Sequence, residues 1–283
     1  MKKVIFSSFL CLSIFVQGQV QTPKASPVGK VEQRVGLTDI SISYSRPAVN
    51  GRKIFGELIP FGVRWRLGAN ENTKITTSDA LIFGSDTLRA GSYALFATPN
   101  SDSWVIDFYT ETTNWGLPEK WETSNVALTV NAKVKKMPMF TENLSISIDN
   151  MEFNSAVLSI TWDKAQVSIP FTLNTKEKVL ASIEKVLSAS TVTANDYNQA
   201  ASYYFAEQID MKKALEWSTK AVEIKGVSAY WMSRLKAQLQ AANGDYKGAI
   251  ETAKISMEAA EKDGDQNYVK MNQQSIEEWS NKK

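Results

Sequence analysis

The sequence predicts an antiparallel β-sandwich followed by an all-α array of helical hairpins. From Val31 to about Leu173, apolar and polar residues alternate in short runs that are separated by turn residues, a pattern typical of antiparallel sheets. After Leu173 the apolar spacing changes to three and four residues, which indicates helices to the end of the sequence. We therefore expect a β-sandwich domain over 31–173 and a helical domain over 174–283.

The strand patterns are clearest in five places. Ile40 to Tyr44, 126–130 and 144–148 alternate strictly, and 95–98 and 104–109 flank the turn PNSDS. A further hairpin is predicted to pair Ala156 to Trp162 with Gln166 to Leu173 across Asp163-Lys164. With about ten strand candidates in all, two packed sheets are expected. Turns are predicted at Gly84-Ser85 and Ala90-Gly91.

The first 18 residues indicate a secretory signal peptide. Two lysines precede an apolar run that ends near Val16, and Gly18 offers a small residue for cleavage. Cys11 raises the alternative of a lipoprotein anchor, but the residues before it are not small and the apolar run is short. We expect a periplasmic or secreted protein with a polar tether over 19–30 and no transmembrane segment after the signal is removed.

The composition excludes several kinds of chemistry. The sequence has no histidine, and its only cysteine lies inside the predicted signal peptide. The processed chain would therefore have no disulfide, thiol nucleophile, histidine-containing catalytic triad or Cys/His zinc site. We expect no cofactor and no metal ion. Any catalysis would depend on carboxylates, lysine, tyrosine or hydroxyl groups.

The charge balance points away from polyanionic partners. The sequence has 32 basic and 30 acidic residues, and loss of Lys2 and Lys3 with the signal peptide leaves 30 of each. No stretch combines five or more basic residues with aromatic ones. Because phosphate backbones and anionic lipids are bound through basic surfaces, we expect neither a nucleic-acid partner nor a polybasic membrane surface.

The helical part contains an internal repeat. Residues 208–223 align with 243–258 at an offset of 35, which superposes Ala214 on Ala249. Residues 196–207 and 228–242 would be the preceding helices, 176–188 an earlier helix and 265–281 a final polar one. This spacing resembles the tetratricopeptide repeat, whose stacked hairpins form a groove for peptides or proteins. With only two recognisable repeats, a helical bundle that packs on the β domain is the alternative.

The β region also resembles a known family. It contains the elements SRP, GRxIFG, PFGxxWRxGANExT and AGxYxLF, which together are specific. Over about residues 24–173 the chain is similar to the domain of unknown function 2911 family of exported bacterial proteins. The resemblance implies an exported location and a domain boundary near residue 173. It implies no reaction, cofactor or catalytic residue.

The most particular segment runs from Tyr44 to Glu71. It holds four of the seven arginines of the chain together with a tryptophan and an Asn-Glu pair. Because guanidinium groups bind carboxylates, phosphates and sugar hydroxyls and stack on aromatic rings, the segment predicts an anionic or carbohydrate ligand. The candidate ligand-binding residues are Arg46, Arg52, Arg64, Trp65, Arg66, Asn70 and Glu71.

A structural role for the same arginines is the competing interpretation. Arg64 and Arg66 would point to one face of a strand, where Glu57, Glu71 or Asp79 could neutralise them in a buried network. The sequence favours this network but leaves the ligand site open, because it cannot show a cavity. The tryptophans divide similarly: Trp104 and Trp162 lie in strand patterns and are expected in the core, whereas Trp115 and Trp121 are candidates for an exposed patch or for a loop folded over one end of the sandwich.

The functional expectation is an exported, non-catalytic binding or protein-interaction protein of the bacterial cell envelope. Its helical domain would bind a peptide or protein partner, and its arginine-rich segment a small anionic or carbohydrate ligand. The alternative is a carboxylate-dependent hydrolase that acts on envelope glycans, with Glu57, Glu71, Asp79 or Asp107 as candidate acids. Nothing in the spacing of these acids singles out a catalytic pair.

Overall fold

The structure is a computed structural model that describes residues 22–282. The predicted signal peptide and the first residues of the predicted tether lie outside the described residues. By its internal contacts the chain divides into two compact units, one that ends at Thr175 and one that begins at Lys176. This division lies two residues from the predicted boundary.

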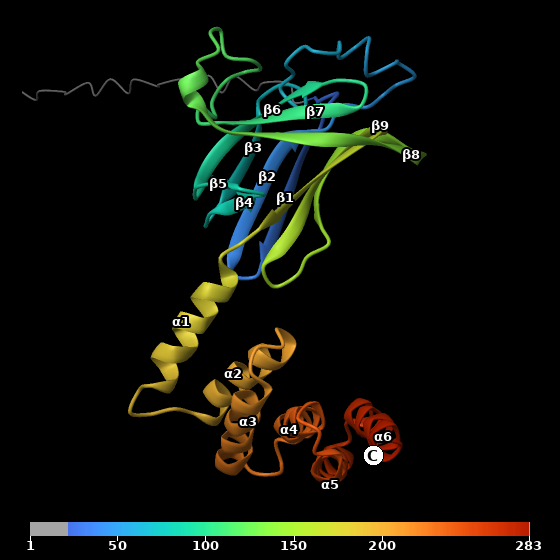
Figure 1. Cartoon of the computed structure of the whole chain (residues 1–283). Coiled ribbons are helices and arrows are strands. Elements are labelled where there is room, and N and C mark those ends of the chain that lie inside the picture. The colour runs from blue at the N-terminus through green and yellow to red at the C-terminus, as the bar shows by residue number, and fades with distance from the viewer. Residues whose placement is uncertain (1–21, 283) are drawn as a thin grey trace, which may run out of the picture. The chain divides into compact units, whose positions relative to one another are not determined.

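Within residues 22–282, the first unit, called the β unit below, contains one sheet of nine antiparallel strands in the order β1-β2-β3-β6-β7-β8-β9-β4-β5 (Figure 1). The strands are β1 (Val28–Val35), β2 (Thr38–Ser45), β3 (Thr73–Thr77), β4 (Leu81–Phe83), β5 (Asp86–Leu88), β6 (Gly91–Pro99), β7 (Ser103–Tyr109), β8 (Val126–Asp149) and β9 (Ser155–Thr172). One 3-10 helix, η1 (Thr123–Asn125), precedes β8.

The predicted tether over 19–30 is too long, because Val28, Gly29 and Lys30 already pair with β2.

Two long strands turn this sheet into a sandwich. β8 has 24 residues and pairs with β7 over Val126–Lys133 and with β9 over Val134–Asp149. The strand patterns at 126–130 and 144–148 therefore belong to one strand. The predicted hairpin across Asp163-Lys164 is wrong: β9 continues through it for 18 residues, and Asp163 adopts a left-handed φ of 53° that bends the strand without ending it.

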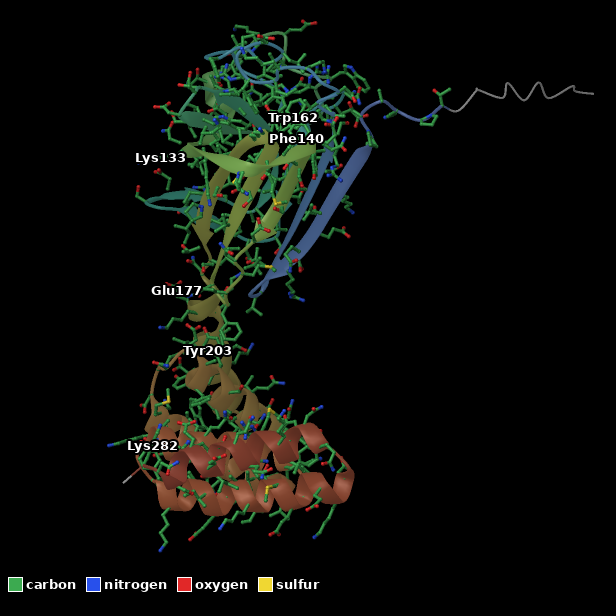
Figure 2. The ribbon with its side chains drawn as sticks, turned by 90° about the vertical axis from the view of Figure 1, so that its right-hand side faces the viewer. Lys133, Phe140, Trp162, Glu177, Tyr203 and Lys282 are labelled. Atoms are coloured by element: carbon green, nitrogen blue, oxygen red, sulfur yellow. The ribbon has the colours of Figure 1, made fainter. Side chains whose placement is uncertain are left out.

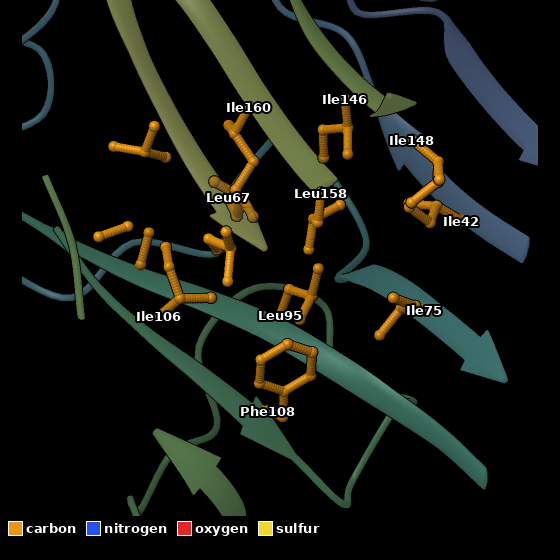
Figure 3. Packing of buried hydrophobic residues seen from close by; sticks show 14 of the residues in the cluster. Ile42, Leu67, Ile75, Leu95, Ile106, Phe108, Ile146, Ile148, Leu158 and Ile160 are labelled. Carbon is orange, nitrogen blue, oxygen red and sulfur yellow. The ribbon is translucent and has the colours of Figure 1, made fainter. Parts of the chain in front are cut away.

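The core lies between the two facing parts of the folded sheet. Figure 3 shows Ile42, Ile75, Leu95 and Phe108 from one part opposite Leu158 and other side chains of β8 and β9. All of these side chains are buried, and removal of their apolar surface from water is the main stabilising term of such a layer. The β-sandwich prediction is confirmed, with the two layers joined by hydrogen bonds into one sheet.

The second unit, called the helical unit below, contains six helices in the part of it that the structure describes. They are α1 (Thr175–Leu187, with its first residue in the β unit), α2 (Ala194–Ala206), α3 (Met211–Lys225), α4 (Tyr230–Ala242), α5 (Tyr246–Asp263) and α6 (Gln266–Ser280). The side chains of Thr193, Asp210, Asp245 and Asp265 accept hydrogen bonds from the backbone of the first turns, which explains where four of these helices begin. The helical prediction is confirmed.

Candidate functional site

The arginine-rich segment forms the connection between β2 and β3. Although it has no regular strand, it is fixed to the sheet at two points. Ala48 forms a bridge to Asn143 of β8, and the backbone of Trp65 exchanges two hydrogen bonds with Ala97 of β6 at 2.7 and 2.8 Å. Leu67, from the same connection, is completely buried in the core. The connection is therefore an ordered part of the β unit that packs on its sheet.

Trp65 packs its ring in the core and also borders the pocket described below. Its ring stacks on Trp162 at a centroid distance of 5.6 Å and meets Trp104 edge-on at 6.3 Å. Its indole Nε1 donates to the carbonyl of Gly68 at 3.0 Å, so its polar atom is satisfied internally. Because Trp65 points inward, the neighbouring Arg64 and Arg66 are placed on the outer side of the connection.

Arg64 is held by groups from two other segments. Its Nε lies 3.3 Å from Oδ2 of Asp107, which is buried in β7 and also accepts from Thr129 Oγ1 at 2.7 Å. Its guanidinium carbon lies 3.5 Å above the ring of Trp121. The stacking and the ion pair fix the plane of the guanidinium group. About a third of the Arg64 side chain remains accessible.

Arg66 is held by backbone groups. Its Nη1 donates to the carbonyl of Asn70 at 2.8 Å, and Asn70 adopts a left-handed φ of 59° that turns this carbonyl toward it. The guanidinium also packs against Gly116, where a Cβ atom would lie 3.1 Å from Nη1. Since Gly116 has a φ of 105° as well, only glycine fits this position without strain.

The other two arginines of the segment have local structural roles. Arg46 Nε donates to the carbonyl of Leu144 at 3.0 Å, and Arg52 donates to the carbonyls of Val49 and Ala48 at 3.0 and 2.6 Å. These carbonyls lie in or beside an irregular segment, so side-chain donors satisfy them. The structure thus gives Arg46 and Arg52 a role different from that of Arg64 and Arg66.

The acids that the sequence predicts as partners of Arg64 and Arg66 are not the ones that contact them. Glu57 pairs with Lys53 at 3.0 Å, Asp79 accepts a hydrogen bond from Thr38, and the Arg64 carboxylate partner is Asp107. Glu71 is exposed, and no hydrogen bond or ion pair of it is found within residues 22–282. The expected network with Glu57 or Glu71 is therefore wrong, because the connection is not a strand that would bring those side chains together.

A pocket of about 300 Å³ lies beside Arg64 and Arg66. Residues 58–66 form one wall and residues 115–117, from the connection between β7 and β8, form the other. Several apolar side chains on these walls are exposed, with Trp115 two-thirds accessible and Val63 and Leu117 about half accessible.

The prediction of an exposed tryptophan is correct for Trp115. Trp121 is half-buried and packs on Phe96 and Tyr109, which fits the alternative of a loop folded over the sandwich.

The pocket combines two kinds of recognition. Arg64 and Arg66 offer planar cationic donors that suit a carboxylate, phosphate or sulfate group. Leu58, Val63 and Trp115 offer apolar surface, and exposed apolar clusters rimmed by polar groups often mark binding sites. The sequence patterns missed Leu58 and Val63, because single apolar residues in an irregular segment carry no periodic signal.

Polar atoms close to the pocket are incompletely satisfied. The side-chain nitrogen of Asn72 donates to the carbonyl of Gly116 at 2.6 Å, and its backbone nitrogen donates to the carbonyl of Asn114 at 3.4 Å. The Oδ1 atom of Asn72 and the Nδ2 atom of Asn114 are buried and have no protein partner within residues 22–282. Buried amide atoms of this kind usually bind ordered water or a ligand.

Other types of site find less support. Within residues 22–282, no group of three or more carboxylate or cysteine side chains is arranged to hold a metal ion. In the same range, no helix has both the length and the apolar character needed to cross a bilayer. The helical unit has its own pocket of about 540 Å³ between α1 and the α2–α3 hairpin, with Leu180, Leu187, Tyr204, Lys213 and Trp217 in its walls.

Comparison with known proteins bears on the β unit. A family model described as "Protein of unknown function (DUF2911)" matches residues 26–171, which is just over half of the chain and includes the whole arginine-rich segment. No curated protein matches the chain, and no solved structure matches it.

Proposed function

We propose that this chain, which belongs to the DUF2911 family, is a non-catalytic binding protein whose β unit holds a small ligand with an anionic group and an apolar body. One observation carries the proposal. Arg64 and Arg66 flank the buried Trp65 and reach the same 300 Å³ pocket, whose remaining walls are largely apolar. The anionic group would bind the guanidinium groups, and the apolar body would lie against Val63 and Trp115.

Preorganisation supports this assignment. Arg64 is clamped between Asp107 and Trp121, and Arg66 between the Asn70 carbonyl and Gly116. Neither guanidinium group would need to be ordered when the ligand binds, which removes a large part of the entropic cost of binding. The hydrogen bonds described above use one of the five N–H donors of Arg64 and one of those of Arg66, so further donors remain for a ligand.

Binding is better supported than glycan hydrolysis. A glycosidase needs two carboxylates on either side of the scissile bond. Within the described part of the chain, the residues that line this pocket include no carboxylate. Asp107 is close to Arg64, but it is buried and occupied by Arg64 and Thr129. Hydrolysis therefore stays the weaker alternative.

The proposal places the protein in the cell envelope and gives the helical unit a separate role. The predicted signal peptide supports export. The apolar pocket between α1 and the α2–α3 hairpin is of a size and composition suited to an apolar side chain of a peptide. Leu180 lies in its wall and is only half-buried, so it is the position to vary in a test of peptide binding.

Thermal-shift screening tests the ligand proposal. The probes are organic acids, uronic acids, inorganic phosphate, neutral glycans and short apolar peptides. A ligand present at about 100 times its Kd stabilises the folded state by about 2.7 kcal/mol, which is a readily measured rise in Tm. Arg66→Ala should abolish the shift given by the acidic ligand, and Arg66→Lys should reduce it, because lysine keeps the charge but loses the planar fork.

Three controls make the result decisive. Arg89→Ala removes an exposed arginine of the same unit outside the pocket, and Glu71→Ala removes the exposed acid of the segment; both should retain the full shift. Leu180→Ser should affect only a peptide-induced shift. The proposal is contradicted if neutral glycans stabilise the protein as much as acids do, if no probe stabilises it, or if Arg66→Ala retains the response to the acid.

A further inference from the structure

An apolar segment protrudes from β8 where the sheet folds over. The register of β8 and β9 runs from Lys136 opposite Ala165 directly to Thr141 opposite Asp163. Four residues of β8, 137–140, therefore face a single residue of β9, Lys164. This large bulge lies at the corner that β8 and β9 form in Figure 1. A bulge of this kind bends a strand and releases its extra residues from the ladder.

The side chains of the bulge are apolar and face solvent. Its sequence is Met-Pro-Met-Phe, with Met139 76% exposed and Phe140 50% exposed. Figure 2 labels Phe140 on the β unit. Pro138 suits a segment without ladder partners, because proline has no N–H to donate. The core packing of the β unit does not account for these residues, since Met139 and Phe140 are among its most exposed apolar side chains.

Four lysines lie on the two strands that form the bulge. Lys133, Lys135 and Lys136 precede it on β8, and Lys164 faces it from β9. All four are exposed, and none forms an ion pair within residues 22–282. The acids nearest in the strand pairing are Asp102, whose carbonyl accepts a hydrogen bond from the backbone nitrogen of Val134, Asp163, and Glu142, which accepts one from the backbone nitrogen of Asn50. The four lysines outnumber these three acids.

We propose that this corner of the β unit docks on an anionic lipid surface. Met139 and Phe140 would enter the boundary between headgroups and acyl chains, while the four lysines contact lipid phosphates through side chains whose methylene stems lie along the apolar tip. The proposal is independent of the ligand pocket. The proposal runs against the sequence-based prediction of no polybasic membrane surface, because Lys164 is distant along the chain and joins the other lysines only in the folded sheet.

The chemistry of the tip favours a lipid surface over a protein partner. Its exposed apolar side chains lie on strands that also carry four exposed lysines without ion-pair partners within residues 22–282. A bilayer requires no complementary shape, and a few inserted side chains with nearby cations can hold a protein at its surface. This combination of apolar and cationic groups therefore matches an anionic membrane.

Cosedimentation with vesicles tests the proposal. The purified protein should bind vesicles of phosphatidylglycerol and phosphatidylethanolamine and remain in solution with phosphatidylcholine alone. Binding should weaken by about fivefold for each lysine replaced by glutamine among Lys133, Lys135 and Lys136, and it should fall as salt is raised. Met139→Ser combined with Phe140→Ser should reduce binding to the anionic vesicles by about tenfold or more, because two inserted side chains are lost.

Matched variants separate this corner from the rest of the surface. Met151→Ser alters a methionine in the connection between β8 and β9 that is 50% exposed, as Phe140 is, and a triple Gln variant of Lys212, Lys254 and Lys270 alters three exposed lysines of the helical unit. Both should bind like the unaltered protein. An environment-sensitive dye on residue 140 of the Cys11→Ser, Phe140→Cys variant should report an apolar environment only with anionic vesicles.

Two results would overturn the proposal. One is equal sedimentation with anionic and zwitterionic vesicles, or none with either. The other is anionic binding that depends on the lysines but is unchanged by loss of Met139 and Phe140, which would indicate a purely electrostatic association without insertion. Circular dichroism of each variant would confirm that the fold is intact.

Discussion

The β unit and the helical unit bury their side chains in different ways. The β unit has one large core to which every strand contributes, and its largest buried members are aromatic. The helical unit has several small clusters in which alanines such as Ala214, Ala249 and Ala253 are completely buried. Contacts in the helical unit run mainly between successive helices. The β unit should therefore unfold as a whole, and the helical unit one hairpin at a time.

The largest effect is expected from truncation in the shared core. Phe108 is completely buried in β7 and lies 5.3 Å from the ring of Phe83. Phe108→Ala should lower the free energy of unfolding of the β unit by about 3–5 kcal/mol through lost burial and a residual cavity. Hydrogen exchange resolved by segment should show weaker protection in all nine strands. Trp115→Ala, at an exposed position, is the control, and loss of protection in β7 alone would argue against a single cooperative core.

An enlarged alanine should have a smaller and more local effect in the helical unit. Ala249 of α5 is completely buried at the repeat position that matches Ala214 of α3. Ala249→Leu should cost about 1–3 kcal/mol, because a leucine overfills the interface. The same exchange measurement should show lost protection in α4 to α6 and retained protection in α2 and α3. Ala242→Leu, at an exposed site, should change little; uniform loss across all helices would contradict the hairpin-by-hairpin description.

The smallest effect concerns pH at the first residues of α2. Hydrogen bonds from the side chain and the backbone nitrogen of Thr193 lower the pKa of Asp196. A carboxyl group with a lowered pKa in the folded state stabilises the fold at pH values above its ordinary pKa of 3.8, and that contribution is lost as the pH falls through the lowered value. Protection of the α2 amides should decline over this acidic range. Asp196→Asn should remove the pH dependence, and an unchanged decline in that variant would assign it to another carboxylate.

The sequence predicts the helical unit better than the β unit, for a physical reason. Helix starts depend on local groups, so Thr193, Asp210 and Asp245 indicate them directly. The repeat offset of 35 likewise appears in the chain itself. Asp163-Lys164 resembles a two-residue hairpin turn, yet β9 runs through it because pairing with the long β8 holds both sides. Long-range pairing overrides a local turn signal.

The candidate site was predictable in part. The arginine-rich segment stands out in the sequence, but the two pairs of arginines have different roles that only tertiary contacts reveal. Arg46 and Arg52 satisfy carbonyls of irregular backbone, whereas Arg64 and Arg66 border a pocket whose second wall comes from residues 115–117. Trp65, a predicted ligand-binding residue, packs its ring in the core and only borders the pocket. A linear pattern cannot tell which side of an irregular segment faces inward.

The long strands β8 and β9 have a consequence for how the protein is made. They lie at the end of the β unit in the chain, and they supply much of the layer that covers β2, β3, β6 and β7. During synthesis or translocation the earlier strands emerge first, with Ile42, Leu95 and Phe108 uncovered until residue 172 follows. The nascent β unit therefore exposes an apolar face for most of its emergence, a period in which a holding chaperone would protect it from aggregation.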